Sequence, residues 1–222
     1  MLSPIWSQYS RANCLPDNCG CEFVRLDQWL AQPSAFWSSL FHVVFALLLY
    51  YQVKEKSLAL KFWIGCLLLL AISSHFGHGS FLEFAMAMDF SGIVLVMSFF
   101  ALFNFAQKKS VSPPVLVVLF LIYQFLLCLT FYSLHKWFKV GICSVIFSVT
   151  ILELIKTEGK YFLKNKNLKN ALIWFSGAFV FFMLDEFKVM CDPESWLTGH
   201  SVWHLGTALS LYYYGKARFR LN

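Results

Sequence analysis

Charged side chains are scarce in this chain of 222 residues, because Asp, Glu, Lys and Arg make up only 14% of it. Soluble proteins carry about 25% charged residues and need them to cover their surface. Hydrophobic residues reach 59% of the chain. Low charge combined with high hydrophobicity excludes a disordered chain as well as a soluble enzyme. The composition therefore indicates an integral membrane protein.

Two further features are absent. Residues 1–35 contain charged residues but no long apolar run, so we do not expect a cleavable signal peptide. No Asn-x-Ser/Thr sequence occurs in the chain, so no glycosylation acceptor points to the secretory pathway. A multi-pass protein of a bacterial inner membrane, or of an ER or Golgi membrane in a eukaryote, fits both observations.

Seven segments have the length and apolarity of membrane spans. A helix crosses a bilayer core of about 30 Å with about 20 apolar residues, and the runs here are continuous, which favours helices over strands. We predict an all-α integral membrane bundle of seven transmembrane helices over residues 36–215, preceded by an N-terminal segment 1–35 and followed by a tail 216–222. The spans are 36–53, 60–77, 85–106, 114–133, 140–155, 171–187 and 201–214.

Lys and Arg are distributed unevenly between the two sides of the predicted bundle. Thirteen of the 18 follow the first, third, fifth or seventh segment. This asymmetry places the N-terminus outside and the C-terminus in the cytoplasm. The basic residues do not gather on one face, so the net charge of +6 does not indicate a nucleic-acid partner.

Four ionisable residues fall at the outer ends of predicted spans. His78 ends the second, Asp89 lies near the start of the third, and His200 and His204 open the seventh. Ionisable groups at membrane depth are costly and are therefore candidate functional residues. The predicted topology brings all four to the same level of the bundle.

The spacing of the histidines favours a metal site. His200 and His204 are four residues apart and share one helical face, and His78 supplies a third ligand. Three protein ligands with one open position are typical of catalytic zinc, which activates water and polarises carbonyl groups. The Glu of the His-Glu-x-x-His metalloprotease motif is missing, so Asp89 is the candidate base. Ser74, one turn before His78, is the candidate oxyanion donor.

A structural interpretation of the histidines stands beside this one. Histidines near span ends also serve as interfacial residues that bond to water or lipid headgroups, and a single His-x-x-x-His is a weak motif. We interpret His42 as a polar contact between helices, His75 as pointing away from His78, and His135 as a loop residue.

Two acidic residues and a lysine-rich loop leave alternatives open. Asp185 and Glu186 close the sixth segment and either reach the metal or serve in capping and helix pairing beside Lys188. The loop 156–169 contains five lysines. It either binds anionic headgroups or, as we expect, is a solvated loop that fixes the topology.

The pattern Ser74-x-x-x-His78, Asp89 and His200-x-x-x-His204 resembles the alkaline ceramidases. Their superfamily also contains adiponectin receptors and lipid-remodelling enzymes of GPI anchors. The resemblance covers the seven spans and the orientation. It implies that the three histidines bind Zn²⁺, that Ser74 stabilises the oxyanion, and that Asp89 transfers protons during amide hydrolysis. The implied activity releases a fatty acid from a ceramide-like membrane lipid.

The cysteines form two groups. Cysteines within spans are expected to be small packing residues, and those on the outer side lie where oxidation is permitted. The resemblance implies a disulfide between Cys21, next to Glu22, and Cys191, with Cys14 and Cys19 as candidates for a second. Free thiols are the alternative. The cysteines within spans are Cys66, Cys128 and Cys143.

The resemblance fails at one site. Eukaryotic ceramidases carry a calcium site built on Asp-Trp-x-Glu-x-Asn, and residues 19–24 here read Cys-Gly-Cys-Glu-Phe-Val. Only the glutamate, Glu22, is retained. We therefore do not expect calcium regulation.

Three other functions remain as alternatives. A lipid ester hydrolase of the same superfamily would use the same residues and differ in its products. A receptor of the adiponectin type would have the opposite orientation. A transporter usually has broken helices and polar groups at the midplane, whereas the histidines here lie at one end.

Overall fold

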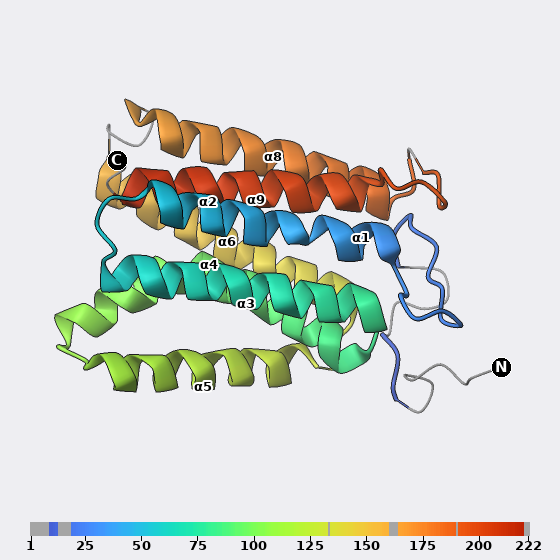
Figure 1. Cartoon of the computed structure of the whole chain (residues 1–222), viewed down its shortest axis with the longest axis horizontal. Helices are drawn as coiled ribbons and strands as arrows, with labels where there is room; N and C mark the ends of the chain where they lie inside the picture. Colours follow the sequence, from blue (N-terminus) through green and yellow to red (C-terminus); the bar gives the residue numbers. More distant parts are fainter. Residues whose placement is uncertain (1–8, 13–18, 133, 160–163, 190, 220–222) are drawn as a thin grey trace.

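A computed structural model describes residues 9–12, 19–132, 134–159, 164–189 and 191–219. These residues form helices joined by short connections, with one isolated β-bridge between Arg11 and Leu82. The all-α prediction is therefore confirmed for the described part of the chain. The helices, most of which lie lengthwise in Figure 1, are α1 (Pro33–Ser38), α2 (Leu40–Gln52), α3 (Leu58–Ser80), α4 (Glu83–Lys108), α5 (Pro113–Phe131), α6 (Lys136–Glu158), α8 (Lys166–Glu186) and α9 (Gly199–Arg218).

Five segments are long and apolar enough to cross a membrane, which indicates a multi-pass membrane protein. α1 and α2 together form one of them. The count of seven spans, the orientation and the division into three regions remain predictions, because α9 does not reach the same apolarity and neither α6 nor α9 is among the five segments. The five segments are Pro33–Gln52, Leu58–Ser80, Glu83–Ala106, Pro113–Phe131 and Lys166–Glu186.

The lower apolarity of α9 results from polar residues that face the interior of the bundle. His204, Thr207 and Ser210 are buried. The Ser210 hydroxyl donates to the Ala171 carbonyl of α8 at 2.8 Å, and the Tyr212 hydroxyl donates to Gln52 of α2 at 2.6 Å. α9 thus has bundle neighbours on two sides, and its polar groups are satisfied within the protein.

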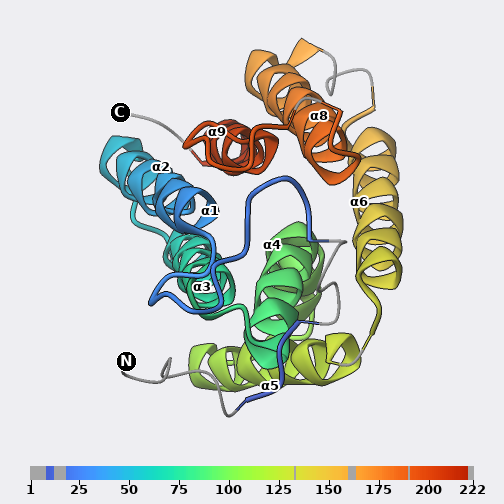
Figure 2. The ribbon, with the colours of Figure 1, turned by 90° about the vertical axis from the view of Figure 1, so that its right-hand side faces the viewer.

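The helices surround a central space. In Figure 2, α2, α3, α4, α6, α8 and α9 form a ring, and α5 lies outside it against α4. α9 packs against both α8 and α2, α2 packs against α3, and α3 packs against α4. Between α6 and α8 the rings of Phe147 and Phe175 stack, with centroids 3.9 Å apart.

α8 and α9 approach each other closely because small residues lie between them. A Cβ atom added to Gly206 would lie 2.6 Å from the Ala178 Cβ. One added to Gly199 would lie 2.5 Å from the Phe181 carbonyl oxygen and 2.8 Å from the Asp185 Cβ. Small residues at helix contacts are typical of membrane bundles, where close packing replaces the hydrophobic effect.

The N-terminal segment crosses one end of the ring (Figure 2). We call this end the site end. α3 and α8 finish there, and α4, α6 and α9 begin there. The disulfide between Cys21 and Cys191 ties this segment to the α8–α9 loop, so the predicted bridge is confirmed. An ion pair between Arg25 and Glu194 at 3.0 Å joins the same two parts. Cys14 lies outside the described residues, and with it the second candidate bridge.

Glu22, the one residue in common with the calcium motif of eukaryotic ceramidases, anchors α1. Its carboxylate accepts the backbone N–H groups of Ser34 at 2.6 Å and Ala35 at 3.0 Å. These donors belong to the first turn of α1, where N–H groups have no partner within the helix. Burial raises the pKa of Glu22, and the two N–H groups oppose this shift. Both carboxylate oxygens of Glu22 are therefore engaged by this chain itself.

We predict that Gly206→Ala destabilises the bundle and that Gly177→Ala does not. The added methyl group of Gly206→Ala meets Ala178, whereas a Cβ at Gly177 has nothing within 4 Å. Overpacking of this kind typically costs about 1–3 kcal/mol, while alanine is the better helix former. Thermal unfolding in detergent should give a lower Tm for Gly206→Ala only. Equal Tm values for the two variants would contradict close packing of α8 on α9.

Candidate metal centre

Three histidines meet at the site end. One ring nitrogen each of His78 on α3 and of His200 and His204 on α9 lies within 4.8 Å of the other two. The Nε2 atoms of His78 and His200 are 3.2 Å apart. His78 and His204 are buried, with exposed fractions of 1% and 3%. The structure thus brings together the three residues that the sequence predicted to converge.

Local structure explains why these residues meet. α3 ends at Ser80, and the next residue, Phe81, adopts a left-handed conformation with φ of 55°. This turn reverses the chain into α4 and places the start of α4 beside His78. At the start of α9, the Thr198 hydroxyl accepts the Ser201 N–H at 3.1 Å and caps the helix. His200 and His204 therefore stand on successive turns of α9.

Side chains from the first helical segment hold two of the imidazole rings. The Nδ1 atom of His78 is 2.8 Å from the Gln32 carbonyl oxygen Oε1. The Nδ1 atom of His204 is 2.8 Å from the Ser38 hydroxyl. Because Gln32 Oε1 can only accept, His78 carries its proton on Nδ1 and leaves Nε2 free to bind a metal. Partners of this kind orient most metal-binding histidines.

The sequence reasoning missed Gln32 and Ser38. Gln32 precedes His78 by 46 positions and Ser38 precedes His204 by 166. No local motif connects residues at these separations. The nearest signal is their position at the outer start of the first predicted span.

Asp89 and Ser74 lie beside the histidines. The Asp89 carboxylate is 3.7 Å from His78 Nε2, and Ser74 hydrogen-bonds to the Asp89 side chain. Both residues are buried and line the same cavity. All five residues predicted for the site therefore come together, with Ser74 directed at the carboxylate.

The donor set fits a metal ion. The group consists of three imidazole nitrogens within 4.8 Å of one another, with a carboxylate nearby. This combination corresponds to the ligand set of catalytic zinc sites. Imidazole also suits copper, iron and nickel. The geometry therefore supports a transition-metal site, and the assignment to zinc belongs to the proposal below.

The remaining histidines have the separate positions expected from the sequence. His42 Nε2 is 3.2 Å from the Thr207 hydroxyl of α9, which makes it a polar contact between helices. His75 Nδ1 is 2.5 Å from the Ser39 hydroxyl, outside the three-histidine group. His135 lies in the connection before α6.

Asp185 and Glu186 have structural partners. Each Asp185 carboxylate oxygen accepts a backbone N–H at 3.0 Å, one from His200 and one from Cys21. Capping thus applies to Asp185. One ligand atom each of Asp185, Glu186 and His200 also lies within 4.8 Å of the other two, so both alternatives left open by the sequence have a counterpart in the structure. Glu186 forms an ion pair with Lys136, so this partner lies on another helix, α6, and not at the end of α8.

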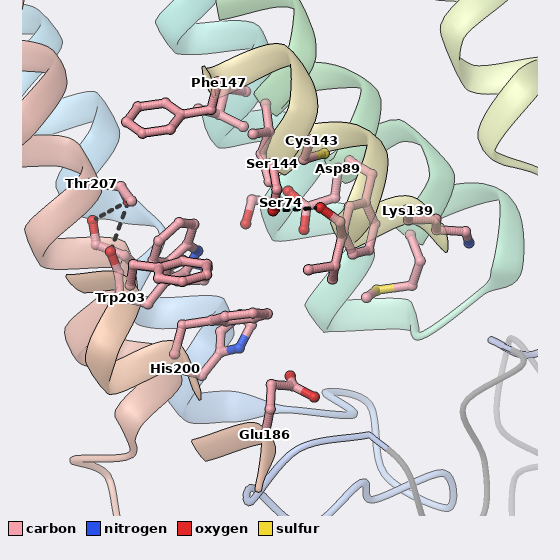
Figure 3. Close-up of a pocket in the computed structure, with 18 of the residues that line it drawn as sticks. Ser74, Asp89, Lys139, Cys143, Ser144, Phe147, Glu186, His200, Trp203 and Thr207 are labelled. Atoms are coloured by element: carbon pink, nitrogen blue, oxygen red, sulfur yellow. Dashed lines mark hydrogen bonds between the residues drawn. The ribbon is translucent and has the colours of Figure 1, made fainter. Parts of the chain in front are cut away.

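An apolar cavity of about 520 Å³ extends from the histidines into the bundle, a size typical of small-molecule sites. Figure 3 shows His200 and Glu186 at one end of it and Phe147 farther in. Aromatic residues contribute to its wall, and α6 and α8 supply much of it. The aromatic residues that line the cavity are Phe81, Phe90, Phe147, Phe175, Phe179, Phe182 and Trp203.

No protein-family model, curated protein or solved structure matches the chain. The resemblance to alkaline ceramidases therefore stays a prediction. Because a helical bundle supports many functions, the function has to be inferred from the chemistry of the site.

We predict one zinc ion per chain in the purified protein, lost in His78→Ala and in His204→Ala. Each substitution removes one of the three ligands. Loss of a residue that only holds a ligand in place lowers metal affinity by about 10–100-fold, so loss of a ligand itself should lower it further. Elemental analysis of the detergent-purified variants measures this directly. His75→Ala, one turn away on α3, is the control and should retain the metal. Equal zinc content in all of them would contradict the assignment of the ligands.

A second prediction concerns the residue that holds His78. Gln32→Leu leaves Nδ1 of His78 without its acceptor, so we expect zinc affinity to fall by about 10–100-fold. Competition with a chromophoric chelator measures the affinity. Gln28→Leu, an exposed position in the same segment, should bind zinc as tightly as the wild type. A loss of the same size in both variants would indicate a general effect on the N-terminal segment.

Proposed function

We propose that the protein is a zinc-dependent hydrolase of membrane lipid amides, of the ceramidase type. The observation that carries this proposal is the meeting of three histidines, two of them buried, with Asp89 and Ser74 at one end of an apolar cavity. Membrane-spanning segments on several sides of the cavity place it within reach of lipids. A water-soluble substrate would not require a cavity surrounded by membrane-spanning segments.

Each residue of the site has a distinct role in the proposed hydrolysis. A zinc ion held by the histidines would activate water and polarise the carbonyl group. Asp89, 3.7 Å from His78 Nε2, takes the proton of the attacking water and passes it to the leaving amine. Ser74, whose hydroxyl hydrogen-bonds to Asp89 in the structure, has a single O–H and would turn it from the carboxylate to the carbonyl oxygen as negative charge develops there. Burial of His78, His204 and Asp89 limits their contact with bulk water, which strengthens these interactions.

The cavity favours a substrate with a long alkyl chain. Its aromatic residues, among them the stacked and half-buried Phe147 and Phe175, would contact an acyl chain. The amide of a ceramide-like lipid would then lie at the histidine end, near the membrane surface. In the predicted orientation this end faces the outer leaflet.

We predict that Asp89→Asn abolishes amide hydrolysis and retains zinc. The amide keeps the shape of the carboxylate but cannot take up a proton, and general-base catalysis contributes about 10²–10⁴-fold. Release of fatty acid from a fluorescent short-chain ceramide in detergent measures the rate. Glu55→Gln, at an exposed position away from the site, should keep wild-type activity.

The substrates distinguish the proposal from its alternative. Hydrolysis of an ester analogue with no hydrolysis of the amide would identify an ester hydrolase of the same chemistry. Full activity of Asp89→Asn would contradict the role of Asp89. A zinc-loaded wild type that cleaves neither lipid would contradict the proposed function and leave the metal site standing.

A further inference from the structure

We propose that Asp185 is a positioning residue that fixes the metal ligand His200 and links it to the Cys21–Cys191 disulfide. The inference rests on the proposed function, because it gives Asp185 a role in holding a ligand of that metal. It deepens the function by making the disulfide-linked surface loops part of the metal centre.

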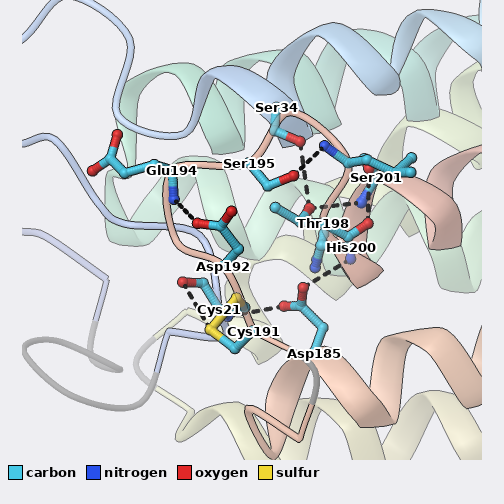
Figure 4. Close-up of a disulfide and its surroundings, with 11 residues drawn as sticks. Cys21, Ser34, Asp185, Cys191, Asp192, Glu194, Ser195, Thr198, His200 and Ser201 are labelled. Atoms are coloured by element: carbon cyan, nitrogen blue, oxygen red, sulfur yellow. Dashed lines mark hydrogen bonds between the residues drawn. A yellow bond between two sulfur atoms is a disulfide. The ribbon is translucent and has the colours of Figure 1, made fainter.

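The hydrogen bonds of Asp185 lead from the disulfide to the metal ligand. One carboxylate oxygen accepts the N–H of His200 and the other accepts the N–H of Cys21, each at 3.0 Å. Figure 4 shows the Asp185 carboxylate between the disulfide and the start of α9. Asp185 has an exposed fraction of only 2%, so water does not compete for these bonds. A buried, charge-assisted pair of bonds of this kind is strong.

His200 depends on this backbone anchor more than the other two ligands do. Gln32 and Ser38 hold the rings of His78 and His204. Among the described residues, no hydrogen bond to Nδ1 of His200 is found. His200 also lies in the first turn of α9, where backbone N–H groups have no partner within the helix. Asp185 supplies that partner and so sets the position of the residue.

Two glycines make room for the carboxylate. A Cβ atom on Gly20 would lie 2.8 Å from Asp185 Oδ2, and one on Gly199 would lie 2.8 Å from the Asp185 Cβ. Gly20 also has φ of +88°, which side chains rarely allow. Each of the two segments that contact Asp185 therefore has a glycine where a side chain would collide with it.

The chemistry requires an aspartate rather than an asparagine. Both partners are N–H donors, and a carboxylate offers an acceptor to each. An asparagine offers one acceptor and one NH₂ group, and the NH₂ group would face a second donor. The negative charge is also favoured at the start of a helix. Asp185→Asn therefore breaks one of the two bonds with almost no change of shape.

Binding of Co²⁺ to the metal-free full-length protein tests the inference, because tetrahedral Co²⁺ has a visible spectrum that reports ligand geometry. We expect Asp185→Asn to bind Co²⁺ about 10–100-fold more weakly, with an altered band at saturation. Asp192→Asn is the matched control. Asp192 is exposed and accepts the Glu194 N–H within the same loop, so its affinity and spectrum should equal those of the wild type.

A second variant covers the case in which circular dichroism shows that Asp185→Asn does not fold. Cys21→Ala combined with Cys191→Ala keeps Asp185 and releases one of its two anchors. We expect weaker Co²⁺ binding in this variant as well, by a smaller factor. Unchanged affinity in the folded double variant would overturn the link to the disulfide.

The outcomes separate this inference from the proposed function. If the wild type binds no Co²⁺, the result contradicts both the metal site and the role of Asp185. If the wild type binds Co²⁺ and Asp185→Asn binds it equally well with the same spectrum, only the role of Asp185 is overturned. Loss of affinity in Asp192→Asn of the same size would also overturn it.

Discussion

Three imidazole rings share one buried space at the site end, in surroundings where an unpaired polar atom is costly. This constraint explains much of the structure around them. Gln32 and Ser38 on the first helical segment face His78 and His204, and the N-terminal segment crosses the end of the ring to bring them there. The disulfide and the Arg25–Glu194 pair hold that segment in place.

Hydropathy and helical spacing predicted the parts of the site that depend on one helix at a time. His200 and His204 share a face because they are four residues apart, and His78 and Asp89 meet because α3 and α4 are consecutive. α9 runs over Gly199–Arg218, four residues past the predicted end of its span. The additional residues include the basic Lys216 and Arg218, which end the apolar run but not the helix, so hydropathy alone underestimates its length.

Contacts between distant segments were beyond the reach of the sequence. The partner of Glu186 is Lys136, 50 positions away on α6, while the pattern suggested the neighbouring lysine. Asp185 reaches Cys21 across 164 positions. Such pairs depend on which helices become neighbours in the ring, and no periodicity encodes that. The Cys21–Cys191 disulfide could be predicted only because a family resemblance supplied the pairing.

The separation of these contacts along the chain also affects how the protein is made. The disulfide joins cysteines 170 positions apart, and α9, which carries two of the three histidines, is synthesised after the helices that it contacts. Until α9 enters between α2 and α8, the ring is open and the buried polar groups that face it have no partner. A chain in which α9 has not yet inserted therefore lacks two of the three histidines of the centre. Insertion of α9 both closes the ring and completes the three-histidine group.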